Sequence, residues 1–352
     1  MSDLPPPSSK IQADPDYVSA YQRCLTIEHR LLGQLNNNDA AAEDETSLIY
    51  IRVVGHLFHF APPKGLDSLT FQVSSCSSDE DVLQLGKLHY DNYLRAFKRN
   101  KGRTPNPTTH PSRPPFESLS RMISEYLHEA PVSHATAKKK ALARDGFRCV
   151  VSKVFDFQSV EHNKELAAQI NATNPQPMRC PTECAHIFPA SLTEHIPPGS
   201  VKRMASATLW TFLRQFGYSE VPEQLNGANI HRLENVMTLR MELHYYFDTL
   251  NLWFVAMPGK PNQYTVKTSH SNLTPFSDTV VTFGSEHADL PPLSPLYLAI
   301  HAACAQVAHL SGAAEHIDKY DRDVEDITVL SPTGESAGLL DHALRGLQIA
   351  GY

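Results

Sequence analysis

The chain has 352 residues, enough for two ordinary domains or for one domain with large elaborations. Hydrophobic residues make up 41% and charged residues 20%, which is typical of proteins that bury an apolar core. No apolar run approaches the roughly 18 residues needed to cross a bilayer, so we expect no membrane span. The net charge of −7 argues against a nucleic-acid binder that works through its overall field, although a local basic surface is compatible with it.

The six cysteines are scattered along the chain, and the amino terminus lacks the apolar core of a secretory signal. This pattern is typical of reduced thiols, so we expect an intracellular protein, cytoplasmic or nuclear. Cys180 and Cys184 could join Cys149 and a histidine in a structural zinc site. Zinc sites usually show two close ligand pairs, however, and only one loose pair is present, so free thiols are the preferred interpretation.

The first part of the chain is predicted to be helical after a short tail. Residues 1–15 are rich in proline and serine and are expected to be disordered. Residues 16–97 form the predicted helical N-terminal region, because apolar residues recur at helical spacing over 16–35. A serine and three acidic residues open the segment 78–97, which is a typical helix start. Periodicity does not decide whether 47–60 is a strand or a helix.

The composition then changes sharply. Residues 98–115 contain five basic residues, no acidic ones and five prolines, which indicates a linker or a basic arm that contacts phosphate. An amphipathic helix is predicted at 116–129, and a short basic helix at 135–145 leads into a strand-like run at 147–151. A further helix is predicted at 203–217.

The last region, 257–352, is predicted to be first β-rich and then helical. Three β-rich runs fall between residues 250 and 284, and helical patterns return at 294–310 and 335–348.

Three segments carry residues suited to chemistry. They are RDGFRCVVSKVFD (144–156), ECAHIF (183–188) and HRLENVMTLRMELHYYFDTLNLWF (231–254). His186 closes a predicted strand, and a histidine can take a proton from water near neutral pH. His244 follows Asn235 by nine residues, and Asp248 follows His244 by four. Positions four apart share a helix face, so His244 and Asp248 can hold one divalent cation, which would polarise a phosphoryl oxygen.

This order and spacing resembles the HNH nucleases, which carry a ββα-metal or His-Me finger domain. The resemblance implies that His186 is the general base, that Asn235 holds the loop orienting it, and that His244 is a metal ligand with Asp248 one turn further on. More widely, the chain resembles a fungal family of HNH endonuclease-like proteins over about residues 16–348. The supporting stretches are SHATAKKKALARDGFRCVVS, ECAHIF, LNGANIHRLENVMTL and LSPLYLAIHAACAQVAHLSGAAEHID.

The resemblance implies an α+β fold, in which a central ββα-metal (HNH) unit is embedded in helical N- and C-terminal elaborations. We assign residues 116–256 to an HNH-type domain with insertions, and expect residues 257–352 to pack on it. The two strands of the unit are expected near 148–152 and 184–188, and its helix near 236–248.

One position departs from the family pattern. Many HNH sites have a metal-binding Asp or His directly before the general base, whereas here that residue is Ala185. A strand alternates faces, so Glu183 lies on the face of Ala185 and could supply the missing carboxylate, while Cys184 shares the face of His186. Alternatively, His186 itself ligates the metal, or the site binds metal weakly or not at all.

Five further residues are candidates for binding substrate: Arg144, Lys138, Lys139, Lys140 and His231. The three lysines could meet phosphate or form a solvated helix face, and His231 could line the site or be structural. The expected cofactor is a divalent metal ion, Mg²⁺ or Mn²⁺ in preference to Zn²⁺.

The leading hypothesis is a metal-dependent HNH-type nuclease that hydrolyses phosphodiester bonds in nucleic acid. A second hypothesis is a repurposed scaffold that acts on a small molecule in a closed pocket, which the acidic charge and Ala185 favour. A third is a non-catalytic interaction protein. A deep apolar cleft over His186, rather than an open basic groove, would favour the second hypothesis over the first.

Overall fold

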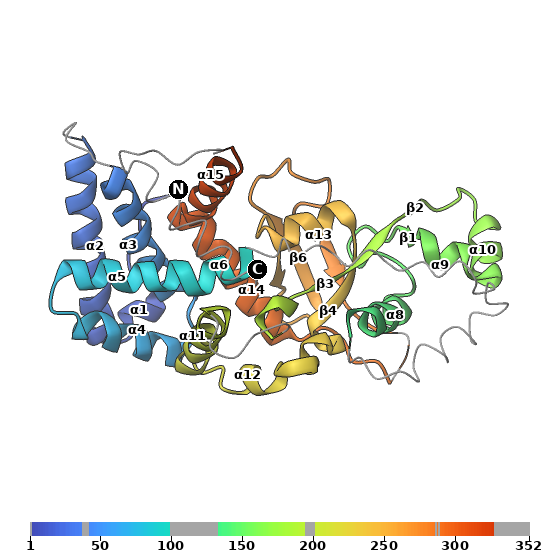
Figure 1. The fold of residues 1–352 in the computed structure, drawn as a ribbon, viewed down its shortest axis with the longest axis horizontal. Helices are drawn as coiled ribbons and strands as arrows, with labels where there is room; N and C mark the ends of the chain where they lie inside the picture. Colours follow the sequence, from blue (N-terminus) through green and yellow to red (C-terminus); the bar gives the residue numbers. More distant parts are fainter. Residues whose placement is uncertain are drawn as a thin grey trace. The chain divides into compact units, whose positions relative to one another are not determined.

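A computed structural model describes residues 2–36, 42–98, 133–193, 201–285, 287 and 289–326 (Figure 1). The chain divides into two compact units. The first, called here the helical unit, comprises residues 1–99, 195–223 and 303–352. The second, called the mixed unit, comprises residues 100–194 and 224–302. Among the described residues, no helix is long and apolar enough to span a membrane.

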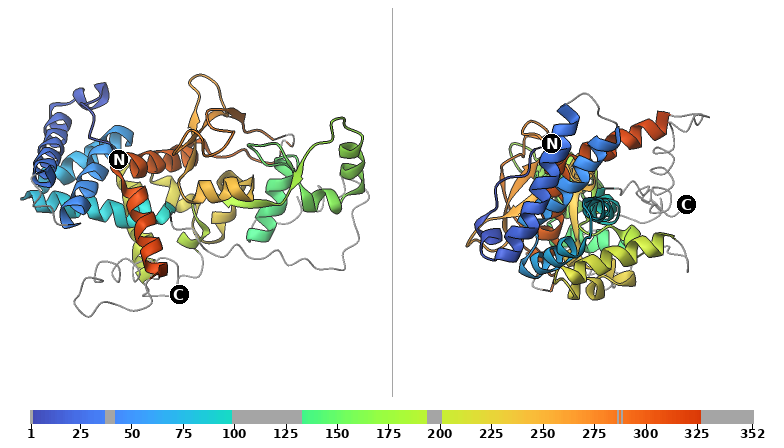
Figure 2. Two further views of the ribbon diagram at one scale, coloured as in Figure 1. Left: turned by 90° about the horizontal axis from the view of Figure 1, so that it is seen from above. Right: turned by 90° about the vertical axis from the view of Figure 1, so that its left-hand side faces the viewer.

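The helical unit is built from helices (Figure 2), many of whose apolar side chains are buried. Its elements are α1 (Ser9–Gln12), α2 (Pro15–Asn36), α3 (Ala42–Phe60), α4 (Pro63–Ser75), α5 (Asp79–His89), the π-helical turn η1 (Tyr90–Leu94), α6 (Arg95–Lys98), α11 (Val201–Gln215), most of α12 (Glu220–Gln224) and α15 (Ala313–Asp326). The undecided segment 47–60 is therefore helical. It lies in α3, where Ile51, Val53 and Val54 are all fully buried, and such a helix shows no polar face in its sequence.

The expectation of a disordered tail at 1–15 is wrong for residues 2–15. Leu4 and Ile11 are buried, and the Leu4 N–H donates to the carboxylate of Glu28 at 3.1 Å. Glu28 also accepts from Nε of Arg52 at 2.6 Å. Two apolar side chains and a buried ion pair therefore hold a segment whose composition alone indicates a solvated tail.

The mixed unit holds all the strands among the described residues. Its helices are α8 (His134–Arg144), α9 (Phe157–Glu161), α10 (Lys164–Asn171), α13 (Met241–Asp248) and the first part of α14 (Pro295–Ser311), with short 3₁₀ turns η2 (Ala190–Leu192), η3 (Gly227–His231) and η4 (Leu233–Asn235). Its strands are β1 (Phe155–Asp156), β2 (Arg179–Cys180), β3 (Thr182–His186), β4 (Val236–Arg240), β5 (Leu252–Ala256), β6 (Gln263–Thr268) and β7 (Val280–Thr282).

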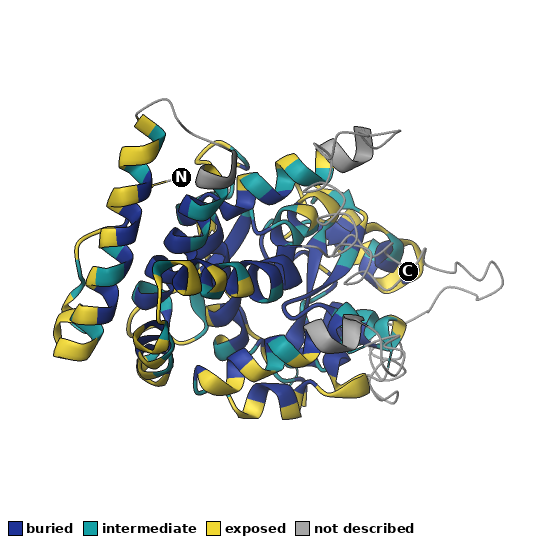
Figure 3. Cartoon of the chain, turned by 60° about the vertical axis from the view of Figure 1, so that its left-hand side comes forward, coloured by how far each residue is buried: buried dark blue, intermediate teal, exposed yellow. Residues whose placement is uncertain are grey.

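Two antiparallel strands followed by a helix form the centre of the mixed unit. Strand β3 pairs with β4, with Thr182 opposite Arg240 and His186 opposite Val236, and α13 begins directly after β4. Almost all of both strands is buried (Figure 3). The sheet β5–β6–β7 follows as an antiparallel meander.

The predicted boundaries of these central elements need correction. Residues 148–152 form no strand and contribute only an isolated bridge between Arg148 and Phe155. The first strand of the central antiparallel pair is β3, and the first part of the predicted helix 236–248 is its second strand, β4. Because β4 is buried on both faces, its apolar run carries no alternation that would separate a strand from a helix.

The chain organisation also differs from the assignment of 116–256 to one domain. Residues 195–223, which include α11, belong to the helical unit, and α14 runs from the mixed unit into the helical unit. Phe212 and Phe216 of the α11 segment pack there on His89, with ring centroids 4.6 and 5.9 Å apart. The linker or arm at 98–115 (apart from Lys98) and the helices predicted at 116–129 and 335–348 lie outside the described residues.

Candidate active site and metal-binding residues

Strand β3 presents candidate residues on both of its faces. Glu183 contacts His244 of α13, whereas Cys184 and His186 lie close to His134 of α8. Side chains alternate along a strand, so Glu183 leaves one face of β3 while Cys184 and His186 leave the other. The groups are still close enough for the charge of His244 to contribute to lowering the pKa of His134 and His186. Ala185, on the face of Glu183, is completely buried.

Asn235 clamps the chain that leaves His186. Its side-chain oxygen accepts from the Phe188 N–H at 2.8 Å, and its amide donates to the carbonyls of Phe188 at 3.0 Å and Ile230 at 2.8 Å. Its backbone carbonyl accepts from the Ile187 N–H at 2.8 Å. Asn235 is fully buried, and three of its four bonds fix the path of the two residues that follow His186, while the fourth joins that path to Ile230.

His186 lies in a group of imidazoles. Its Nε2 is 3.0 Å from Nδ1 of His231, and its ring stacks on that of His134 with centroids 5.6 Å apart. Burial, together with the neighbouring histidines, holds the pKa of His186 well below its usual range. The ring is therefore neutral at neutral pH and retains a lone pair that can accept a proton.

His244 bridges two carboxylates. Its Nδ1 lies 2.6 Å from Glu183 and its Nε2 lies 3.2 Å from Asp248. Burial acts to lower the pKa of His244, but the two carboxylates outweigh it and raise the pKa to about 10. The hydrogen bond to His244 lowers the pKa of Glu183, whereas burial raises that of Asp248. The cationic ring of His244 thus lies between the carboxyl groups of Glu183 and Asp248.

The structure brings the three predicted metal ligands together, but not around one point. Glu183 and Asp248 occupy opposite ring nitrogens of His244, which point away from each other. One carboxylate can therefore share an ion with His244, while the other binds the far side of the ring. Carboxylate oxygens with one imidazole nitrogen form a donor set that suits a hard divalent cation, so the residues fit the expected metal.

A second group with ligand character was not anticipated as a set. Ligand atoms of His134, Cys184 and His186 all lie within 4.8 Å of one another. Strand alternation had placed Cys184 beside His186, but His134 is the first residue of α8, and nothing local in the sequence shows where that helix packs. Among the described residues, Cys184 thus groups with these two histidines and not with Cys149 and Cys180.

Arg144 is buried, contrary to the expectation that it contacts substrate. Its guanidinium donates to the carbonyls of Leu233 at 2.6 Å and Val236 at 2.7 Å, and pairs with Asp145 at 2.7 Å. Asp145 in turn accepts from the Thr238 N–H at 2.9 Å. The pair therefore anchors the start of β4 on either side of Asn235.

The three predicted lysines are all half-buried on α8. The positive charge of Lys138 contributes to lowering the pKa of Glu183 and also acts on the pKa values of Cys184 and His134, so this lysine lies near both groups. His231 is buried, and its bond to His186 makes it a neighbour of the predicted base.

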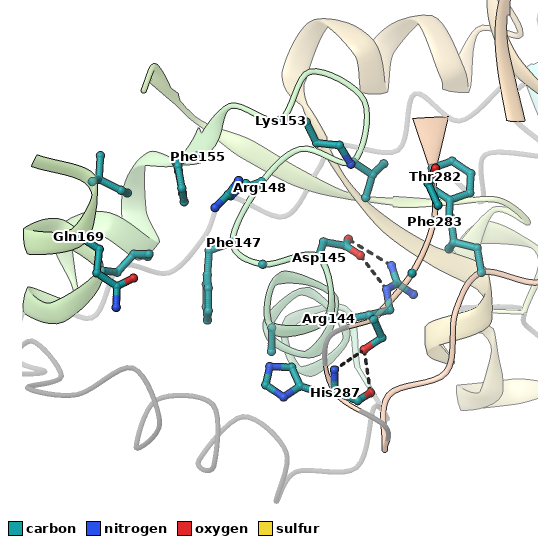
Figure 4. A pocket seen from close by; sticks show the side chains of 18 of the residues that line it. Arg144, Asp145, Phe147, Arg148, Lys153, Phe155, Gln169, Thr282, Phe283 and His287 are labelled. Carbon is teal, nitrogen blue, oxygen red and sulfur yellow. Dashed lines mark hydrogen bonds and ion pairs between the residues drawn. The ribbon is translucent and has the colours of Figure 1, made fainter. Parts of the chain in front are cut away.

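A cavity of about 660 Å³ lies beside the α8–β1 loop (Figure 4). Arg148 and Lys153 contribute positive charge to its wall, and Phe147, Phe155 and Phe283 contribute aromatic surface. His186, Asn235 and His244 are not among the described residues that line it. This cavity is therefore not the apolar cleft over His186 that would favour a small-molecule enzyme.

Residues 149–255 match the family of HNH endonucleases. The matched segment contains β3, β4 and α13, and with them Glu183, His186, Asn235, His244 and Asp248. His134 and Arg144 precede it. No curated protein and no solved structure matches the chain.

Proposed function

We propose that the protein is a metal-dependent HNH-type nuclease, in which β3, β4 and α13 form the ββα-metal unit. The observation that carries this proposal is the clamp of Asn235 on the segment after His186. Through its hydrogen bonds to Phe188, Asn235, the predicted orienting residue, holds the chain that follows His186, the predicted base. The match of residues 149–255 to HNH endonucleases supports the same reaction, hydrolysis of a phosphodiester bond.

His186 acts as the general base. Its neutral ring takes a proton from the attacking water, while the contact from His231 fixes the orientation of the imidazole. Asn235 maintains the chain direction that presents the ring. The depressed pKa makes His186 a weak base that is nevertheless unprotonated at neutral pH.

Glu183 and Nδ1 of His244, which lie 2.6 Å apart, would hold the metal ion between them. A divalent cation there supplies charge that stabilises the phosphoryl oxygens and the leaving oxyanion. Asp248 then holds the other ring nitrogen of His244 and fixes the orientation of the ligand, as carboxylates commonly do behind metal-bound histidines. The carboxylate favours Mg²⁺ or Mn²⁺.

The substrate is a nucleic acid, and basic residues of the mixed unit provide its phosphate contacts. Lys138 lies near Glu183, and Arg148 and Lys153 stand in the cavity wall with aromatic neighbours. Positive charge beside aromatic rings is a combination that binds exposed nucleotides. These local charges offset the acidic balance of the whole chain.

The test is a cleavage assay with the full chain. Plasmid DNA and RNA are incubated with Mg²⁺, Mn²⁺ or chelator, using wild type, His186→Ala and His244→Ala. The control is His162→Ala, an exposed histidine of the same unit. We expect cleavage that chelator abolishes, that both site variants lose and that the control keeps. Absence of cleavage from folded wild type under every metal, or cleavage unchanged in both site variants, contradicts the proposal.

A further inference from the structure

His134, Cys184 and His186 form a ligand set separate from the Glu183–His244 pair. The set combines the first residue of α8 with two alternate residues of β3, and its ligand atoms lie within 4.8 Å of one another. Cys184 and His186 are buried, and His134 is half-buried. A backbone hydrogen bond with Cys184 holds the His134 ring against the strand.

These donors favour a different ion from the divalent cation proposed at Glu183 and His244. One sulfur with two imidazole nitrogens suits zinc, whereas Mg²⁺ and Mn²⁺ prefer oxygen. Tetrahedral zinc bonds place such ligand atoms about 3.3 to 3.8 Å apart, so the set needs to contract by at most roughly 1.5 Å. Water or substrate can fill the fourth position of a zinc ion held by these three residues.

A partner outside the set is already in place. Nδ1 of His231 lies 3.0 Å from Nε2 of His186. Metal-bound histidines commonly use their second nitrogen for such a bond, which fixes the tautomer and aims the first nitrogen at the ion. His231 can therefore orient His186 as a ligand, just as it would orient His186 as a base.

We propose that His134, Cys184 and His186 bind a zinc ion and that this ion inhibits the enzyme. On binding, the Cys184 thiol releases its proton to solvent as the sulfur–zinc bond forms, and a lone pair of His186 is donated to the metal. The same imidazole cannot then accept a proton from water. The inhibition rests on the proposed function, because it acts through the general base, whereas the binding does not.

Binding is tested with Co²⁺ as a spectroscopic probe and with Zn²⁺ against a competing chelator, on the full chain. We expect one ion whose spectrum shows thiolate-to-cobalt charge transfer. Cys184→Ser loses that absorption, and His134→Gln weakens binding by more than the roughly 10- to 100-fold expected for the outer partner variant His231→Ala. Cys180→Ser and His162→Gln are the matched controls, and both should keep the charge-transfer absorption and the binding.

Unfolding curves establish that each variant is folded. Should Cys184→Ser not fold, His134→Gln, at the half-buried end of α8, carries the test. Absence of a thiolate signal in wild type, or a signal that persists in folded Cys184→Ser, overturns the proposal.

Inhibition is tested by adding Zn²⁺ to the Mg²⁺-dependent cleavage reaction. We expect wild type to lose cleavage, and His134→Gln to keep a larger fraction of its own zinc-free rate. If zinc binds with thiolate but no cleavage occurs under any metal, the site stands and the nuclease proposal fails. If cleavage occurs and zinc leaves it unchanged, the inhibitory role is overturned while the nuclease proposal stands.

Discussion

At the scale of single residues, Asn235 shows how one amide can position a site. Both of its amide protons meet carbonyls and its oxygen meets an N–H, so its donors and acceptor are all matched. The segment after His186 would otherwise have no ladder partner, because the β3–β4 pairing ends at His186 and Val236. The family resemblance predicted that Asn235 holds this segment, and its orienting role in catalysis stays a prediction.

Asn235→Asp keeps the shape of the side chain but replaces two donors by a buried carboxylate oxygen facing two carbonyls. We expect a loss of about 3 to 5 kcal/mol in the free energy of unfolding, measured by urea titration. Asn229→Asp, on an exposed residue of η3, is the matched control and should change stability little. Equal stability of the two variants would contradict the clamp.

Arg144 is a residue whose role only the structure could assign. A basic residue beside a nuclease motif suggests phosphate binding, yet the guanidinium of Arg144 donates to two backbone carbonyls and pairs with Asp145. Arg144→Lys retains the charge but cannot span both carbonyls. We expect a loss of about 2 to 4 kcal/mol in unfolding free energy.

The control for this variant is Arg148→Lys, at an exposed position four residues further on. Its unfolding curve should stay close to that of wild type. If Arg144→Lys instead keeps full stability and only weakens nucleic-acid binding, Arg144 is a substrate contact and its structural assignment fails.

At the scale of elements, helix starts follow local chemistry closely. Ser78 caps α5, accepting from the Asp81 N–H, while the Asp81 carboxylate accepts from the Ser78 N–H at 2.8 Å. The serine and acidic first turn that predicted this helix are these same residues. Such reciprocal caps involve neighbours in sequence, so the sequence alone is sufficient to find them.

Ser78→Ala removes one side of this cap. We expect it to lower the free energy of unfolding by about 1 kcal/mol, measured by chemical denaturation. Ser77→Ala changes the neighbouring exposed serine and serves as the control, with little effect expected. A Ser77→Ala variant as unstable as Ser78→Ala would show that the cap contributes nothing specific.

At the scale of the whole molecule, buried histidines couple stability to pH. His89 in the helical unit is fully buried between Phe212 and Phe216, and neither of its ring nitrogens has a hydrogen-bond partner among the described residues. Burial lowers the pKa of His89 from 6.5 to about 4. Burial also lowers the pKa of His56, in the same unit, to about 4.

The unfolded chain binds a proton at these histidines below pH 6.5, whereas the folded chain does so only near pH 4. Stability is therefore fully present above pH 6.5 and is lost as the pH falls towards 4, by roughly 3 kcal/mol for each histidine. We expect His89→Leu to remove its share of this dependence in urea titrations between pH 7 and 4.5. His29→Leu, on an exposed histidine of α2, should leave the dependence as in wild type.

The sequence by itself determined which residues are candidates for chemistry, the alternation that puts Glu183 on the other face of its strand from Cys184 and His186, and several helices whose periodicity or caps are local. Only the tertiary structure decided that β4 is a strand and α3 a helix, because both are buried too completely for their sequences to show a period. It also decided that α11 belongs with the helical unit, that His134 meets Cys184, and that two acids bind opposite nitrogens of His244. Those outcomes depend on contacts between residues far apart in the chain, and such contacts leave no spacing in the sequence.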